Sequence, residues 1–339
     1  MDNRGQLCTI RHRISPAGRP YKRKVFPLER FLYSDNEKRY HTYSYELRKK
    51  FGKKVAKVAL NAGFSCPNRD GARGFGGCSY CSAQKSGDFA GNPQIPLRTQ
   101  FEIQKNQTSG KWPDTDYIAY FQAGTNTYAP LKVLQQCFEE ALSFPRVVGL
   151  SISTRPDCLP CRICDYLAEL NTRTYLTVEI GLQSIHDVTA ARINRGHTYK
   201  NFLEGLDQLS SRGIRTCVHL INGLPGETSG MMRETAQVIS TLPIQAVKIH
   251  LLHVLENTPM AEEYRSGKLA LLQKEEYVSI VCDQLELLRP DIVIQRLTGD
   301  GDHSLLLGPF WSCNKRDVLN SIDREMVRRN SFQGCRYNL

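Results

Sequence analysis

Residues 59–81 read Ala59-Leu-Asn-Ala-Gly-Phe-Ser-Cys66-Pro-Asn-Arg-Asp-Gly-Ala-Arg-Gly-Phe-Gly-Gly-Cys78-Ser-Tyr-Cys81. Only two residues separate Cys78 from Cys81, so both thiolates can reach irons of one small cluster. Cys66 adds a third thiolate from a glycine-rich loop, and glycine allows such a loop to fold tightly. Three thiolates can hold three irons of a 4Fe-4S cluster and leave the fourth iron open. The alternatives are zinc, although a structural zinc ion usually takes four ligands as two close pairs, and unpaired structural cysteines.

The segments around this loop indicate the fold. Residues 54–61 read as a short strand that leads into the loop. Further strand candidates are residues 116–122, 147–153, 174–183, 213–221 and 245–253, and helix candidates are residues 97–109, 130–143, 158–170, 199–212 and 228–241. Strands joined by helical crossovers pair in parallel, because parallel neighbours need long connections. We therefore predict an α/β fold with a partial (β/α)6 barrel, whose chemistry lies at the carboxyl ends of the strands. A doubly wound sheet also fits the pattern.

Three regions follow along the chain. Residues 1–52 are expected to form a basic, aromatic-rich N-terminal extension, and residues 53–260 the barrel. Residues 261–339 contain a strand candidate at 291–297 and an amphipathic helix candidate at 314–330. We expect this last region to be an α/β cap that shapes the substrate pocket.

Motifs spread over residues 55–260 resemble those of the radical S-adenosylmethionine (radical SAM) enzymes. Cys78-Ser-Tyr-Cys81 is similar to the Cys-x-aromatic-Cys ending of that superfamily, and Gly124-Thr-Asn-Thr127 resembles its turn after the second strand. Glu179-Ile-Gly-Leu-Gln-Ser and His219-Leu-Ile-Asn-Gly-Leu-Pro-Gly-Glu are similar to segments of the elongator catalytic subunit and of the anaerobic coproporphyrinogen oxidase group. The long loop between the first two cysteines, together with Ser-Thr-Arg-Pro-Asp157 and a C-terminal Gly-Pro-Phe-Trp-Ser stretch, most resembles the uncharacterised bacterial YtqA/YhcC family.

This resemblance implies a cofactor site. The implied cluster ligands are Cys66, Cys78 and Cys81. The implied S-adenosylmethionine contacts are Tyr80, Gly124, Thr125, Ser153, Gln183, Arg195 and His219. Arg195 would pair with the methionine carboxylate through its planar fork, while Gln183 and Ser153 would bind ribose hydroxyls. The reduced cluster would then cleave S-adenosylmethionine to a 5′-deoxyadenosyl radical that abstracts hydrogen from a substrate, with flavodoxin or ferredoxin as the kind of electron donor.

The charge is concentrated near the N-terminus. The chain has 45 Lys and Arg against 34 Asp and Glu, and residues 11–57 hold 15 of the basic and 4 of the acidic residues. Aromatic residues alternate with these charges, and this combination predicts binding of tRNA or another RNA through residues 11–57. The alternative is a solvated basic segment whose aromatic rings pack on the barrel. A second, weaker basic patch would comprise Arg324, Arg328, Arg329 and Arg336.

Two further groups of side chains invite a metal or ligand interpretation. Cys158, Cys161 and Cys164 are close enough in sequence for an auxiliary cluster, but on a helix they spread over about a third of the circumference, and free Cys is a common small core residue. His250 and His253 on the last barrel strand are expected to be hydrogen-bonded structural residues. The chain begins without a signal-peptide pattern and has no apolar stretch of membrane-spanning length, so we expect a cytoplasmic protein without a membrane partner.

The leading hypothesis is a radical SAM enzyme that acts on tRNA or another RNA. The first alternative is a radical enzyme acting on a small anionic metabolite or a tetrapyrrole. The second is a zinc-stabilised, non-catalytic RNA-binding protein. No side chain is assigned a catalytic role by the sequence.

Overall fold

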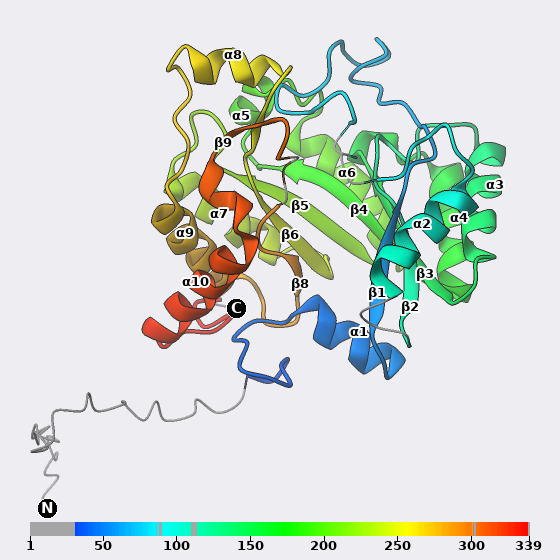
Figure 1. Cartoon of the computed structure of the whole chain (residues 1–339), viewed down its shortest axis with the longest axis horizontal. Coiled ribbons are helices and arrows are strands. Elements are labelled where there is room, and N and C mark those ends of the chain that lie inside the picture. Colours follow the sequence, from blue (N-terminus) through cyan, green and yellow to red (C-terminus); the bar gives the residue numbers. More distant parts are fainter. Residues whose placement is uncertain are drawn as a thin grey trace, which may run out of the picture. The chain divides into compact units, whose positions relative to one another are not determined.

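A computed structural model of the protein describes residues 31–85, 87, 90–109, 114–299, 301 and 303–337. Its centre is one curled, half-barrel sheet of seven parallel strands in the order β1-β2-β3-β4-β5-β6-β8 (Figure 1). The strands are β1 (Val55–Leu60), β2 (Asp116–Phe121), β3 (Val147–Thr154), β4 (Tyr175–Gln183), β5 (Thr216–Asn222), β6 (Ala246–Leu251) and β8 (Val293–Arg296). The predicted α/β class and partial barrel are confirmed.

Helices connect successive strands and cover the outer face of the sheet (Figure 1). They are α2 (Leu97–Ser109), α3 (Leu131–Leu142), α4 (Cys161–Arg173), α5 (Asp187–Arg192), α6 (Tyr199–Ser210) and α7 (Ser229–Ser240). Local capping explains where some begin. Before α6, the Thr198 hydroxyl accepts from the Asn201 backbone N–H at 3.2 Å, and the Asn201 side chain accepts from the Thr198 N–H at 3.1 Å. This reciprocal capping satisfies backbone donors that the first helical turn leaves unpaired.

The sheet has one strand more than the six predicted. The extra strand is β8, which was expected in a separate C-terminal cap but pairs in parallel with β6, placing Val293 opposite Ala246. Without β8, the buried strand β6 would present an unpaired edge, which proteins avoid. The C-terminal region therefore completes the half-barrel.

The two longer helices of the C-terminal region, α9 (Lys274–Leu287) and α10 (Lys315–Arg328), pack against each other. The sequence predicts α10 but not α9. Helix α9 packs against both α7 and α10, and most of its residues from Tyr277 onward are buried. A helix buried on several sides lacks the single apolar stripe that reveals a surface helix in a sequence.

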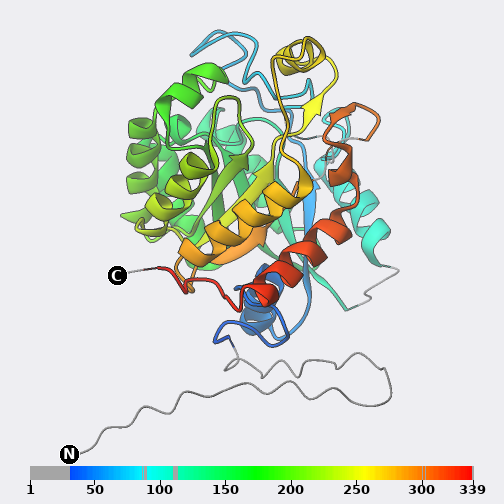
Figure 2. The same ribbon diagram turned by 90° about the vertical axis from the view of Figure 1, so that its left-hand side faces the viewer.

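Residues 31–52 are part of the folded barrel and not an appended extension. They contain α1 (Tyr43–Phe51), which contacts both β1 and β8. Tyr40 and Leu47 are buried, and the Phe51 ring packs edge-on against Tyr175 with centroids 5.4 Å apart. Figures 1 and 2 show α1 at the end of the sheet opposite the cysteine-containing loop. For these aromatic residues the packing alternative is correct, while residues 11–30 lie outside the described part of the chain.

A few smaller elements lie near the top of the half-barrel in Figure 1. Strands β7 (Val254–Leu255) and β9 (Leu306–Gly308) form an antiparallel pair, and α8 (Pro259–Arg265) follows β7. Short 3-10 turns occur at Pro156–Cys158 and Phe310–Cys313.

None of the helices in the described residues combines the length and apolar character needed to cross a membrane.

Candidate cofactor and substrate site

The cysteine loop, residues 66–81, follows the carboxyl end of β1 and is fixed by its own polar side chains. Asn68 is fully buried; its Nδ2 donates to the Asn194 carbonyl at 2.6 Å and lies 3.8 Å from the Cys78 Sγ. The Arg69 guanidinium donates to the carbonyl of Cys81 at 2.8 Å. These contacts hold the two ends of the long loop together and anchor it on the segment after α5.

The three thiols of this loop are unbridged and partly exposed. Burial, reinforced by the thiols of Cys81 and Cys66, raises the pKa of Cys78 to about 11. Among the described residues, no three His, Cys, Asp or Glu side chains converge as ligands of a single metal ion would. Thiolates of a 4Fe-4S cluster bind separate irons and need no such convergence, and thiolate is the ligand these clusters take. The donor set therefore fits the cluster.

The second cysteine set has a different character. Cys158 and Cys164 are buried, whereas Cys161 is exposed. The Cys161 Sγ lies 3.4 Å from the Gln208 Oε1, and the Cys164 Sγ lies 3.4 Å from the Leu159 carbonyl oxygen. These thiols face separate surroundings, as expected for packing residues.

The turn after β2 packs directly on the start of the cysteine loop. Gly124 has a φ of 74°, and a Cβ at this position would lie 2.5 Å from the Phe64 carbonyl oxygen. The Thr125 N–H donates to the Ser65 carbonyl at 3.0 Å. Only glycine permits both the left-handed backbone and this close approach.

Replacing Gly124 with alanine is expected to lower the free energy of unfolding and to displace the cysteine loop. Gly213→Ala is the matched control, because Gly213 also has a positive φ of 66° but has no atom within 4 Å of the place a Cβ would take. Left-handed strain should cost about 1–2 kcal/mol in both variants, and overpacking should add roughly 1–3 kcal/mol in Gly124→Ala alone. Urea denaturation measures the difference, and iron content after anaerobic reconstitution measures the effect on the loop. Equal losses in both variants would show that the close approach has no energetic weight.

Gln183 and Arg195 lie at the carboxyl end of β4 and just after α5. Gln183 has a φ of 62°, and its Oε1 is buried without a hydrogen-bond partner. The Arg195 Nε donates to the His197 carbonyl at 3.0 Å, and its Nη1 donates to the Ser184 carbonyl at 2.6 Å. Its Nη2 has no hydrogen bond and lies 3.5 Å from the Asp187 carboxylate. The two-point pairing predicted for Arg195 does not fit this conformation, because backbone carbonyls occupy most of the guanidinium.

The other predicted contacts have distinct surroundings. The carbonyl oxygen of Ser153 accepts from the backbone and the side chain of Asn126, at 3.1 and 2.8 Å. The His219 Nε2 lies 2.7 Å from the Glu179 Oε2, and burial, with Lys248 nearby, lowers the pKa of His219 to about 4. His219 is therefore neutral near pH 7, and its Nε2–H donates a hydrogen bond to the Glu179 carboxylate. Tyr80 lines the cavity described next.

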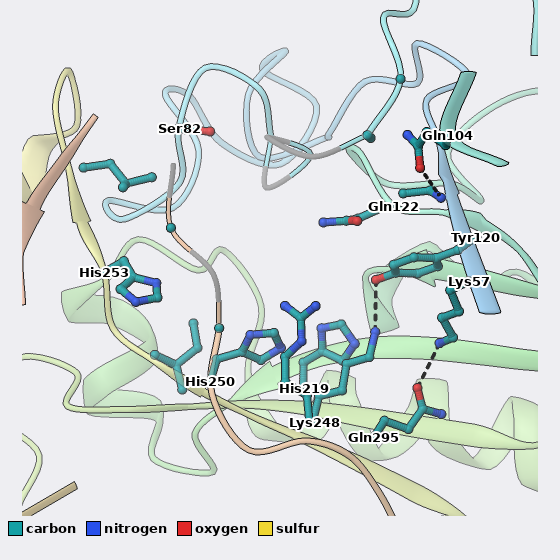
Figure 3. Close-up of a pocket in the computed structure, with 18 of the residues that line it drawn as sticks. Lys57, Ser82, Gln104, Tyr120, Gln122, His219, Lys248, His250, His253 and Gln295 are labelled. Carbon is teal, nitrogen blue, oxygen red and sulfur yellow. Dashed lines mark hydrogen bonds between the residues drawn. The ribbon is translucent and has the colours of Figure 1, made fainter. Parts of the chain in front are cut away.

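A cavity of about 820 Å³ fills the inside of the half-barrel, within the usual range of ligand sites. Six strands of the main sheet, strand β7 (Val254–Leu255) and the end of the cysteine loop contribute to its walls. In Figure 3, Ser82 lies above the cavity, Tyr120 and Gln122 enter from one side, His253 from the other, and Lys248 rises from the floor. Of the predicted cofactor contacts, Tyr80, Gln183 and His219 line this cavity.

A buried ion network forms the floor of the cavity. Glu179 is 0% exposed and accepts from Lys57 at 2.5 Å, from Ser151 at 2.5 Å and from Lys248. Burial alone would raise the pKa of Glu179, but Lys248 and Lys57 hold it well below its usual range. Lys248 also donates to the Tyr120 hydroxyl at 3.2 Å.

The sequence did not single out Lys57, Tyr120, Lys248 or Gln295. A signal existed, because Lys57 is the only polar residue of the apolar strand β1, and Lys248 and His250 are the only polar residues of β6. His250 was expected to be hydrogen-bonded, yet its Nε2 is buried without a partner, whereas the His253 Nε2 lies 3.0 Å from the Ser312 hydroxyl.

Comparison with known proteins agrees with this site. The sequence model of the Radical SAM superfamily matches residues 66–239, and that of the Radical_SAM C-terminal domain matches residues 244–328. The chain is 55% identical to the uncharacterized protein YtqA of Bacillus subtilis, over 90% of this chain and 94% of that protein. It is 34% identical to the protein YhcC of Escherichia coli, over 82% of this chain and 89% of that protein.

A solved structure shows the same fold. Elp3 of the archaeon Methanocaldococcus infernus superposes with a TM-score of 0.62 at 18% identity, over 83% of this chain. This chain spans 64% of that structure, less than two thirds of its length. The cysteine loop, the half-barrel and these matches together lead to one conclusion: the chain belongs to the radical SAM superfamily, whose members use a 4Fe-4S cluster and S-adenosylmethionine, and is an enzyme of the group that contains YtqA and YhcC.

Proposed function

We propose that this enzyme cleaves S-adenosylmethionine reductively at a 4Fe-4S cluster held by Cys66, Cys78 and Cys81, and directs the resulting radical at a substrate in the half-barrel cavity. The observation that carries the proposal is the position of the cysteine loop at the carboxyl ends of the strands, above that cavity. When bound, the two cofactors supply the electron and the hydrogen-abstracting 5′-deoxyadenosyl radical.

The protein's own residues would bind and orient S-adenosylmethionine and enclose the substrate. Gln183 has an unsatisfied acceptor that suits a ribose hydroxyl, and the Nη2 amino group of Arg195 makes no hydrogen bond and suits a carboxylate. A buried polar atom without a partner is costly, so a ligand that satisfies both atoms gains binding energy. Neutral His219, fixed by Glu179, adds no charge to the cavity wall. The turn at Gly124 holds the cysteine loop in position by packing against Phe64.

The test is reductive cleavage without substrate. The full chain is reconstituted anaerobically with iron and sulfide, reduced with dithionite and incubated with S-adenosylmethionine. We expect iron and sulfide in equal amounts and formation of 5′-deoxyadenosine and methionine. Bound zinc without any cleavage would instead support the non-catalytic alternative. In the same assay, reduced flavodoxin or ferredoxin should replace dithionite, which tests the proposed class of electron donor.

The proposal places the enzyme in the cytoplasm. All cysteines in the described residues are unbridged thiols, as expected in a reducing compartment.

An RNA substrate is supported by the basic residues between positions 11 and 57. In the described part of that segment, however, Tyr40, Tyr43 and Phe51 pack within the protein. The C-terminal basic patch is also engaged, because Arg324, Arg328, Arg329 and Arg336 form ion pairs with neighbouring acidic side chains. RNA binding would thus depend on residues 11–30, outside the described part, together with exposed lysines such as Lys49 and Lys50. Salt-dependent binding of tRNA that is lost on deleting residues 1–30 would support it. A small anionic substrate is favoured by the charge of the cavity.

A further inference from the structure

We infer that the inner end of the cavity is a binding site for an anionic group, a carboxylate or a phosphate, of a small-molecule substrate. The site consists of Lys248, Arg296 and His250, with Tyr120 beside them. This inference rests on the proposed function, since it assigns the substrate class of the same cavity. It is supported by an excess of positive charge in the cavity lining, which no carboxylate of the described residues balances.

The excess follows from the side chains that line the cavity. Lys57, Lys248 and Arg296 all line it, and no Asp or Glu in the described part of the chain does so. Glu179 lies beneath the floor as the sole carboxylate hydrogen-bonded to Lys57 or Lys248 among the described residues. His219 and His250 add no further positive charge near pH 7, because burial lowers the pKa of both rings. Three cations therefore face one carboxylate.

The hydrogen bonds of each cation show whether it has donors left for a ligand. The Lys57 ammonium donates to Ser151 at 3.1 Å, to Glu179 at 2.5 Å and to Gln295 at 2.9 Å. An ammonium has three donors, so Lys57 has none left for a ligand. Its role is to hold the floor together.

Unlike Lys57, Lys248 and Arg296 have N–H donors left for a ligand. Lys248 is 5% exposed and donates only to Glu179 and Tyr120 among the described residues, which leaves one N–H for a ligand. Arg296 makes no hydrogen bond or ion pair with another described residue, and its charge acts on both His250 and Tyr120. The buried Nε2 of His250 also has no partner. Lys248 and Arg296 are opposite each other in the β6–β8 pairing, and His250 lies two residues further along β6; all three line the cavity. One ammonium N–H, one guanidinium and one imidazole nitrogen there thus have no hydrogen-bond partner in the described part of the protein.

A charge that is shielded from water and lacks a partner is costly; Lys248 is buried and shares its carboxylate with Lys57, and Arg296 is half-buried. If Lys248 served only to neutralise Glu179, Lys57 would already suffice. S-adenosylmethionine does not balance the excess either, because it carries a sulfonium and an amine besides its carboxylate. An anionic group on the substrate supplies the missing charge and accepts the spare hydrogen bonds, which charge assistance makes strong.

The unbalanced positive charge also favours a small anion over an RNA strand as the ligand of the cavity. An enzyme that acts on a base takes it out of the stack into its pocket, and a base is uncharged while the phosphates stay on the strand. A base would therefore leave Lys248 and Arg296 unbalanced. A carboxylate or phosphate at the end of a small molecule would not.

The test measures anion binding to the anaerobically reconstituted full chain by isothermal titration calorimetry at low ionic strength. Inorganic phosphate and succinate are the probes, and they distinguish a phosphate from a carboxylate group. We expect saturable binding of at least one of them, weakened about tenfold or more in Arg296→Gln, which corresponds to about 1.4 kcal/mol. His250→Phe keeps an aromatic ring and should weaken binding several-fold. Lys200→Gln is the control, because that side chain is 84% exposed and is not part of the cavity lining.

The outcomes are separable. The inference would be overturned if neither phosphate nor succinate bound. It would also be overturned if wild type, Arg296→Gln and His250→Phe bound the anion with the same affinity. Binding of tRNA that depends on Arg296 while neither small anion binds would overturn it as well. Cleavage of S-adenosylmethionine by the same preparations without substrate reports the proposed function independently, so intact cleavage together with absent anion binding rejects only the site. Thermal denaturation of each variant confirms that it is folded.

Discussion

Replacing Cys78 with alanine is expected to abolish reductive cleavage of S-adenosylmethionine and to remove most of the iron that the reconstituted protein binds. The reason is that the cluster would keep only two of its three protein ligands, Cys66 and Cys81, and two thiolates hold a 4Fe-4S cluster poorly. The measurements are iron and sulfide content, the absorption spectrum, and 5′-deoxyadenosine formed under dithionite. The same outcome is expected for Cys66→Ala and Cys81→Ala.

The matched control is Cys161→Ala, from the second cysteine set. Cys161 is exposed, and its thiol contacts Gln208. This variant should retain the iron content and the cleavage activity of the wild type. If Cys161→Ala lost about as much iron as Cys78→Ala, the second set would hold a cluster after all, and our interpretation of its thiols as packing residues would be wrong.

The second large effect is expected from Glu179→Gln. Glutamine has the shape of glutamate but no charge, so Lys57 and Lys248 would lose their shared counter-ion inside the half-barrel. Removing one partner of a buried ion pair typically costs about 3–5 kcal/mol, and urea denaturation should show a loss of that size. Glu139→Gln is the control, because its pair with Arg173 is over 40% exposed on both sides and should contribute at most about 1 kcal/mol. Similar losses in both variants would contradict a buried network.

The same carboxylate predicts how stability depends on pH. The folded protein holds the pKa of Glu179 well below its usual value, whereas the unfolded chain should have a pKa of about 4.3. The stabilisation is therefore complete above that value and is lost as the pH falls towards the folded-state pKa. As the pH falls below about 4.3, wild type should lose stability more steeply than Glu179→Gln. Parallel profiles for the two proteins would rule out this contribution.

The cysteine loop and the parallel strands were predictable because their signals are local. Two residues between Cys78 and Cys81, and apolar runs of strand length between helices, depend on nothing distant in the chain. The ion network was not predictable in this way. Lys57 is on β1 and Lys248 on β6, which are not neighbours in the sheet. They meet over Glu179 on β4 because the sheet curls, and a strand pattern states which face a side chain occupies but not how strongly the sheet bends.

Strand β8 shows a second limit. Its existence could be predicted from its composition, but its partner could not, because a residue pattern does not say which edge a strand joins. The predicted boundary at residue 260 assigned it to a separate cap, whereas Val293 pairs opposite Ala246 in the main sheet. For Arg195 the difficulty was geometric. The sequence indicates a permanently charged side chain but not that the carbonyls of Ser184 and His197 already accept two of its N–H groups.

The position of β8 also affects how the chain is made. Helix α1 is synthesised early, but it rests on both β1 and β8, and Thr42 bridges to Ile294. On the ribosome, until residues 293–296 have emerged, α1 can pack against β1 but not against β8, and the edge of β6 stays unpaired. An unpaired hydrophobic edge is prone to association with other chains. Nascent chains stalled before β8 should therefore engage chaperones strongly, and those stalled well after α10 much less.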